Sequence, residues 1–214
     1  MSLILWPSVR RDDWVVEVSS KFNYVGWETL HSLVARLALS ISRSYLPQVL
    51  VGALRGGYVV ARMLSDFLGI DELAVIGVKF YKGVGERGEK PVITVPVVHD
   101  VKDKAVLVVD DVADTGRTLE TAVADLRLRG ARSVKTAVVF LKPRSIVIPD
   151  FYAEITDSWV IFPWEICDFL REMTRKGDLN AVNYLMSYIQ KSGEIANAIQ
   201  QILGVSKGED STRV

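Results

Sequence analysis

Three carboxylates follow an apolar run in the middle of the chain, at a spacing that suits the binding of a phosphorylated sugar. The run Val106–Val109 is followed by Asp110 and Asp111, and Asp114 then opens the stretch Asp-Thr-Gly-Arg-Thr at 114–118. Carboxylates accept hydrogen bonds from ribose hydroxyls and provide the oxygen ligands that Mg²⁺ prefers. Free backbone N–H groups at the start of a helix bind phosphate. The residue types therefore predict a sugar-phosphate site built from acids and amides.

The residues around these acids predict a strand, a turn and a helix. Val106–Val109 are aliphatic without alternation, which is typical of a strand buried on both faces. Asp114, Thr115 and Gly116 favour a turn and a helix N-cap. The apolar residues that follow have helical spacing and end at a glycine stop signal, namely Leu119, Ala122, Val123, Leu126 and Gly130. Ligands of open α/β sheets bind where strands end, which is where the paired acids are expected.

A second strand-to-helix turn lies earlier in the chain. Val49–Ala53 predicts a buried strand, Leu54-Arg55-Gly56-Gly57 a turn, and the next helix is expected to end at Gly69. Two glycines let the backbone pass close to a ligand, and the arginine adds a fixed positive charge. By itself this pattern is more often only a tight turn. Beside the acidic turn, it favours a second anion-binding loop.

The remaining segments continue an alternation of helices and strands. Trp27–Ile41 has the stripe of an amphipathic helix, and residues 73–80 and 134–141 are apolar strands. The polar, glycine-bearing stretch Tyr81–Lys90 precedes another extended run at 91–98, and predicts either a lid or an exposed hairpin without function. The alternation predicts an α/β domain with a mostly parallel sheet. A Walker-type site is the competing interpretation, but the chain has no G-x-x-x-x-G-K-[ST].

Composition narrows the class of protein. The 214 residues include 26 basic and 26 acidic side chains, so no charge excess favours a nucleic-acid partner. One cysteine, Cys167, cannot form an internal disulfide and is expected to be a small buried residue. No apolar run reaches the roughly 20 residues of a membrane span, and the N-terminus lacks a secretory signal. We expect a cytoplasmic protein without a membrane partner. His31 and His99 have no partners at triad or metal spacing.

The central stretch resembles the signature of the type I phosphoribosyltransferases for 5-phosphoribosyl pyrophosphate (PRPP): four apolar residues, two acids, two residues, Asp-Thr-Gly, one residue, Thr. Leu54–Tyr58 resembles the family's pyrophosphate loop, where a cis peptide would precede Arg55. The resemblance implies the type I phosphoribosyltransferase fold, an α/β fold with a mostly parallel five-stranded sheet flanked by helices, a small hood and a C-terminal helical extension. It assigns PRPP and phosphate binding to Arg55, Gly56, Gly57, Asp110, Asp111, Asp114, Thr115, Gly116, Arg117 and Thr118. Arg117 replaces a small residue common in relatives.

The segment from Lys142 to Glu165 contains the residue types of a purine pocket: a lysine after a strand, tryptophans and an acid. By itself this composition favours core aromatics and a surface lysine. The Lys-Pro pair, the spacing to Trp159 and the W-x-x-x-P-W-acid ending resemble the hood of xanthine–guanine phosphoribosyltransferases, and Asp150-Phe151 resembles hypoxanthine–guanine enzymes. The resemblance implies purine binding by Lys142, at the 6-oxo group, by Trp159, through stacking, and by the Val160 main chain. Glu165 would lie near the purine 2-position or the metal.

The resemblance also implies a reaction. The 5-phosphoribosyl group would move from PRPP to N9 of hypoxanthine, guanine or xanthine, giving a nucleoside monophosphate and pyrophosphate. Mg²⁺ would be the cofactor with Asp111 as its ligand, Asp110 would hold ribose hydroxyls, and Asp114 would accept the N7 proton as the catalytic base. The alternatives are specificity for adenine or a pyrimidine, or a non-catalytic regulator that senses PRPP or a nucleotide. A lysine donor at O6 disfavours adenine, which presents an amino group there.

We expect three parts along the chain: an N-terminal segment at 1–24, a phosphoribosyltransferase core at 25–166 with its hood at about 142–166, and a helical extension at 167–214. Apolar residues in the extension predict two helices within 168–202, with a frayed end after them. The role of the extension is open, either capping the body or pairing subunits. Family habit implies a homodimer or a higher homo-oligomer.

Overall fold

The computed structural model describes residues 21–82 and 89–203. The described residues divide into two compact units, Glu28–Asp157 and a second unit made of residues 21–27 together with residues 158–203. Each unit is described by itself. The expectations for most of the N-terminal segment, for the tip of the lid at 83–88 and for the end of the chain at 204–214 lie outside the described residues.

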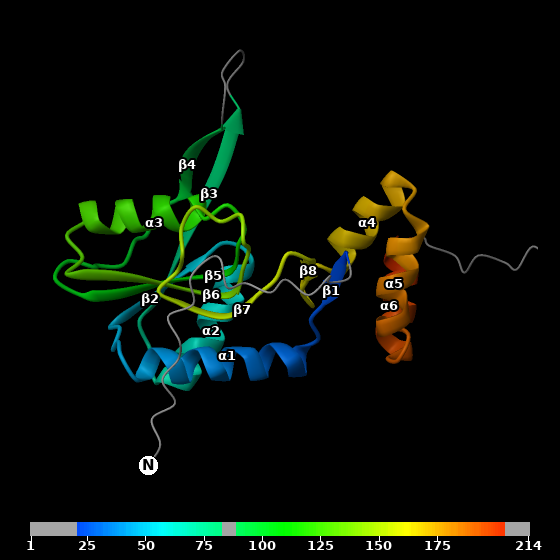
Figure 1. The fold of residues 1–214 in the computed structure, drawn as a ribbon, viewed down its shortest axis with the longest axis horizontal. Coiled ribbons are helices and arrows are strands. Elements are labelled where there is room, and N and C mark those ends of the chain that lie inside the picture. Colours follow the sequence, from blue (N-terminus) through cyan, green and yellow to red (C-terminus); the bar gives the residue numbers. More distant parts are fainter. Residues whose placement is uncertain (1–20, 83–88, 204–214) are drawn as a thin grey trace, which may run out of the picture. The chain divides into compact units, whose positions relative to one another are not determined.

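The described part of the first unit contains one six-stranded sheet, in the order β4-β3-β2-β5-β6-β7 (Figure 1). Five neighbouring strands run parallel, from β3 to β7, and β4 joins the edge as an antiparallel partner of β3. The expected mostly parallel α/β sheet with five parallel strands is confirmed, with an antiparallel sixth strand added. The strands are β2 (Val49–Ala53), β3 (Leu73–Lys82), β4 (Glu89–Val95), β5 (Ala105–Ala113), β6 (Ser133–Leu141) and β7 (Phe151–Ile155).

Helices cover both faces of this sheet, with α3 (Arg117–Leu128) on one face and α1 (Trp27–Ser42) and α2 (Gly56–Leu68) on the other (Figure 1). Strand β2 is buried at every position, and β5 is apolar and buried over residues 105–109, because helices cover both faces of the sheet there, as the sequence predicts. Val49, Val51 and Val106 belong to the core that includes the α3 side chains. Gly52 points the other way, since a Cβ there would lie 2.6 Å from Tyr58 Cα of α2. Gly69 and Gly130 end α2 and α3 with positive φ.

The segment expected to form a hood is divided between the two units. Phe151–Ile155 is the parallel edge strand β7, paired with β6, and Asp150 caps this pairing by accepting hydrogen bonds from the Thr136 amide (2.8 Å) and hydroxyl (3.0 Å). Trp159–Ile161 is strand β8 of the second unit. Asp150 and Phe151 thus lie at the beginning of β7. The turn-forming residues before them in the sequence did not indicate a strand.

The second unit combines a short sheet with three helices of the described residues. Strand β1 (Phe22–Tyr24) pairs in parallel with β8, and their neighbours are α4 (Ile166–Lys176), α5 (Leu179–Ile189) and α6 (Gly193–Leu203). The prediction of two helices is wrong, because Gly177 with φ 70° and the Asp178 N-cap divide one expected helix into α4 and α5. Inside lies a separate apolar core, which includes Phe22, Phe169, Leu185 and Ile199.

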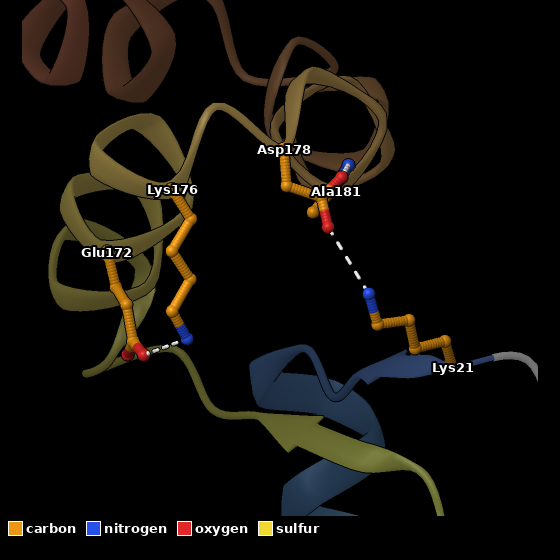
Figure 2. Close-up of polar contacts among 5 residues, drawn as sticks. All are labelled: Lys21, Glu172, Lys176, Asp178 and Ala181. Carbon is orange, nitrogen blue, oxygen red and sulfur yellow. Dashed lines mark hydrogen bonds and ion pairs between the residues drawn. The ribbon is translucent and has the colours of Figure 1, made fainter.

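Polar contacts fasten β1 to this helical layer. Lys21 Nζ lies 3.2 Å from Asp178 Oδ2, and the other Asp178 oxygen accepts from the Ala181 amide at 3.0 Å (Figure 2). Tyr184 Oη donates to the Phe22 carbonyl at 3.0 Å and accepts from the Tyr24 amide at 3.3 Å. No helix in the described residues is long and apolar enough to span a membrane.

Candidate active site

Asp110 and Asp111 lie within the last residues of β5, which continues to Ala113 instead of ending at Val109. The strand continues because β6 offers partners, with Asp110 opposite Val138 and Val112 opposite Phe140. Backbone amides turn toward the carboxylates: the Asp111 amide donates to Asp110 Oδ1 at 3.0 Å and the Val112 amide to Asp111 Oδ1 at 2.8 Å. The two acids are therefore held near the carboxyl end of a parallel strand, inside it and not after it as the sequence predicts.

The two acids share an unfavourable electrostatic environment. Removal from water, and secondly the neighbouring Asp111 carboxylate, raise the pKa of Asp110 well above its ordinary value. A bound cation or a set of hydroxyl donors would relieve this cost by compensating the paired negative charges. The raised pKa thus favours a ligand that brings positive charge or hydrogen-bond donors to Asp110.

The loop between β2 and α2 approaches the acids so closely that it requires glycine. A Cβ built on Gly57 would lie 2.6 Å from the Val109 carbonyl oxygen and 2.8 Å from Asp110 Oδ1. The Leu54–Arg55 peptide bond is cis, at the position expected from the family resemblance. Arg55 is exposed at the end of this loop, and Gly56 begins α2. The two predicted anion loops therefore lie side by side, with Gly57 against Asp110.

The turn after β5 is shaped by Gly116, the N-cap of α3, whose φ is 80°. This left-handed conformation favours glycine, and space also requires it, since a Cβ would lie 2.6 Å from Ser145 Oγ. The Arg117 amide lies 3.5 Å from Thr115 Oγ1. Arg117 and Thr118 form the first turn of α3, where backbone N–H groups have no partner inside the helix. The turn therefore has the form of the predicted phosphate loop.

The residues after β6 pack on this turn. The Lys142 amide donates to the Ala113 carbonyl at 3.0 Å, and the Ile146 amide to the Thr115 carbonyl at 3.0 Å. Lys142 is only 5% exposed, and burial lowers its pKa, while the nearby Asp114 carboxylate acts in the opposite direction. The interpretation of Lys142 as a surface residue, which composition by itself favours, is therefore wrong. Lys142 therefore lies close enough to Asp114 for the two charges to interact.

Arg144 is a site residue that the sequence analysis missed. Its Nε donates to Asp114 Oδ1 at 2.8 Å, and its Nη2 pairs with the same oxygen. No motif of the sequence carries a signal for this contact, because it joins two loops that follow different strands.

The other predicted purine-binding residues belong to the second unit. Trp159 is 45% exposed, with its ring edge-to-face with Phe169 at 6.2 Å and Lys176 Nζ 5.7 Å from its centroid. Lys176 also pairs with Glu172 at 2.6 Å (Figure 2). Val160 is buried, and Glu165 occupies the N-cap position of α4 without a side-chain capping bond.

The acids fit one kind of metal. Among the described residues, no group of three or more His, Cys, Asp or Glu side chains is placed to hold an ion. Mg²⁺ usually takes one or two carboxylates and completes its shell with substrate oxygens and water. The neighbouring Asp110 and Asp111, with their mutual repulsion, match that requirement. A closed protein cage for a metal is not built from these residues.

Comparison with known proteins agrees with this architecture. The family model of the phosphoribosyl transferase domain matches residues 26–169. A xanthine-guanine phosphoribosyltransferase of Idiomarina loihiensis is 31% identical over 154 residues, covering 69% of this chain and 89% of that protein. A protein of the same name from Cereibacter sphaeroides is 33% identical over 150 residues, covering 67% of this chain and 86% of its own length.

A solved structure gives the same result. The purine phosphoribosyltransferase of Pyrococcus horikoshii is 46% identical, with a TM-score of 0.64, and the match covers 68% of this chain and 95% of that one. The fold is that of the type I phosphoribosyltransferases. The chain belongs to the phosphoribosyltransferase family.

Proposed function

We propose that this chain is a purine salvage phosphoribosyltransferase. It transfers the 5-phosphoribosyl group from PRPP to N9 of a 6-oxopurine and releases pyrophosphate. The observation that carries the proposal is Lys142, a buried cation at the end of β6, next to the turn with Asp114. The names of the similar proteins, xanthine-guanine and purine phosphoribosyltransferases, support the same substrate class.

PRPP binds along the two strand ends. The amides and hydroxyls of 114–118 hold the 5′-phosphate, because helix N-termini favour anions. The loop of Arg55, Gly56 and Gly57 holds the diphosphate, where Gly57 gives the close backbone approach. Asp110 accepts hydrogen bonds from ribose hydroxyls, which compensates its costly charge. Asp111 is the ligand for Mg²⁺, which neutralises charge on the leaving diphosphate when it is bound.

The base is selected by hydrogen-bond polarity. Lys142 donates to the 6-oxo group. The family resemblance assigns ring stacking to Trp159, main-chain contacts to Val160, and a place near the purine 2-position or the metal to Glu165. An adenine amino group would leave two donors facing each other at a buried lysine, which costs about 1–3 kcal/mol per unpaired group. Hypoxanthine, guanine and xanthine all carry the required oxygen.

The chemical step is a displacement at C1′. The bond from C1′ to the diphosphate oxygen breaks, N9 bonds to C1′, and the N7 proton passes to Asp114. The charged oxocarbenium-like state is stabilised by the groups that hold the diphosphate and ribose. The proposal also includes a homodimer or a higher homo-oligomer, which is the habit of the family, and a cytoplasmic location.

The proposal is tested by pyrophosphate release from PRPP and Mg²⁺ with five bases: hypoxanthine, guanine, xanthine, adenine and uracil. We expect turnover with one or more 6-oxopurines and none with adenine or uracil. Turnover with adenine or uracil only would contradict the assigned pocket. Tight PRPP or nucleotide binding with no turnover of any base would indicate a regulator.

The role of Lys142 is tested by Lys142→Met. Loss of a charged hydrogen bond of about 1.5–3 kcal/mol should lower kcat/KM for the preferred 6-oxopurine by about 10- to 100-fold. PRPP affinity should stay within about twofold, since the 5′-phosphate and diphosphate loops are intact. Unchanged selectivity against adenine in Lys142→Met would contradict the assignment.

A further inference from the structure

Arg144 makes a two-pronged contact with a single oxygen of Asp114. Both Nε and Nη2 of its guanidinium are directed to Oδ1. Two donors on one carboxylate oxygen fix the position of that oxygen from two directions, which a single ammonium does not.

The loop that carries Arg144 is itself fixed to the turn that carries Asp114. On one side the Lys142 amide bonds to the Ala113 carbonyl, and on the other the Ile146 amide bonds to the Thr115 carbonyl. Ser145, which is buried, fills the space above Gly116. Both flanks of Arg144 are thus hydrogen-bonded to both flanks of Asp114. The ion pair joins two backbone segments that already have a defined register.

We propose that Arg144 is a positioning residue for the base Asp114. This inference rests on the proposed function. Arg144 holds Oδ1, so that Oδ2 faces the purine and accepts the proton. In this step the N7–H bond breaks, its electron pair returns to the imidazole ring, and the proton bonds to Oδ2 as N9 bonds to C1′. Arg144 stays charged throughout and touches neither substrate.

The experiment compares steady-state kinetics of Arg144→Met and Arg144→Lys with the wild-type chain. Misplacing a catalytic group by about 1 Å costs up to about 100-fold, so we expect kcat to fall about tenfold in Arg144→Met. The KM for PRPP should stay within about twofold. Arg144→Lys should recover only part of kcat, because an ammonium keeps the charge but not the fork.

The matched control is Arg36→Met. Arg36 pairs with Glu154 at 2.6 Å, and the exposed fractions of these side chains, 62% and 46%, resemble the 61% and 51% of Arg144 and Asp114. Removing this pair tests the effect of losing an exposed ion pair of the same unit. We expect kcat unchanged in Arg36→Met, and thermal unfolding midpoints that match between the two methionine variants.

A double-mutant cycle separates positioning from other roles. In an Asp114→Asn background, Arg144→Met should have no further effect on kcat, because Arg144 acts through Asp114. An equal loss in both backgrounds, an unchanged kcat in Arg144→Met, or a raised KM for PRPP with normal kcat would overturn the inference. Absence of turnover in the wild-type chain with every base would instead refute the proposed function, and the inference with it.

Discussion

At the scale of the residue, Asp110 lowers the stability of the ligand-free protein and is placed to bind a ligand. Its carboxylate is taken out of water and lies beside Asp111, which raises its pKa. A bound ligand that brings positive charge or hydrogen-bond donors would stabilise this charged carboxylate. This is the pattern expected of residues kept for binding at the expense of stability.

The stability cost of Asp110 has a defined pH dependence. Its folded pKa lies above the unfolded value of about 3.9, so the folded state binds more protons between the two values. The contribution of Asp110 to stability is complete below about pH 4 and is lost as pH rises through the folded pKa. Asp110→Asn should therefore gain stability over the wild-type chain across this window, by about 1.4 kcal/mol per unit of raised pKa.

Urea unfolding of both proteins at a series of pH values, without ligand, measures this difference. At low pH the two free energies of unfolding should converge, because the wild-type carboxyl is then protonated in both states. A constant difference at all pH values would show that the amide acts through packing instead of charge.

Asp114 gives the second prediction at this scale. Asp114→Asn keeps the size of the side chain and removes the proton acceptor, so kcat should fall by about 10²- to 10⁴-fold. The Kd for PRPP, measured by calorimetry without base, should stay within about twofold. Asp125→Asn is the control, since Asp125 pairs with Arg129 farther along α3, and kcat should be unchanged there. Equal losses of PRPP affinity and turnover in Asp114→Asn would exclude a role as base.

At the scale of the element, the site depends on how closely the β2–α2 loop can approach β5. Gly57 faces the Val109 carbonyl and the Asp110 side chain, which are parts of a buried strand and cannot shift freely. The loop can therefore approach the acids this closely only because Gly57 has no side chain. The register of β2 on β5, with Gly52 opposite Val109, sets this position.

Gly57→Ala tests this close approach. The added methyl would meet backbone atoms at 2.6 and 2.8 Å, so we expect a loss of about 1–3 kcal/mol in the free energy of unfolding. PRPP affinity should fall as the loop moves away from Asp110. Gly193→Ala is the control, because no atom lies within 4 Å of a Cβ there, and its effect should stay within about 0.5 kcal/mol. A Gly57→Ala protein with normal stability and affinity would contradict the required contact.

At the scale of the whole molecule, the chain builds a second core from its two ends. Strand β1 lies near the start of the described residues, yet it pairs with β8 and is held by α5. The strand that carries Trp159 and Val160 is thus supported by the C-terminal extension. The extension supports the predicted purine-binding strand from within its own unit.

Tyr184→Phe tests this support. The variant removes one hydroxyl that forms hydrogen bonds with both the Phe22 carbonyl and the Tyr24 amide. We therefore expect the free energy of unfolding to fall by about 1–3 kcal/mol. Amide hydrogen exchange should accelerate in β1 and β8 and stay unchanged in β5 and β6. Tyr188→Phe is the control, since the Tyr188 hydroxyl has no hydrogen bond within the described part of the chain and its ring contacts are kept. Accelerated exchange in the main sheet as well would mean that the units unfold together.

The sequence by itself determined the local units of this protein. Apolar runs, turn residues and helical spacing identified each strand-turn-helix unit around the acids, because these patterns depend only on neighbours along the chain. The PRPP signature extended this to the family, which the comparisons confirm. Three strands, β1, β7 and β8, were not predicted from the sequence, and α4 was merged with α5. Strand β7 lies in a segment whose turn residues concealed it.

Only the tertiary structure decided which residues meet. The burial of Lys142, the contact of Gly57 with Asp110, the Arg144 pair and the β1–β8 ladder all join segments that are distant in the sequence. Such contacts depend on strand order, on register and on the path of loops between them. None of these leaves a periodic signal in the chain, since each follows from the closure of the whole sheet and not from local propensity.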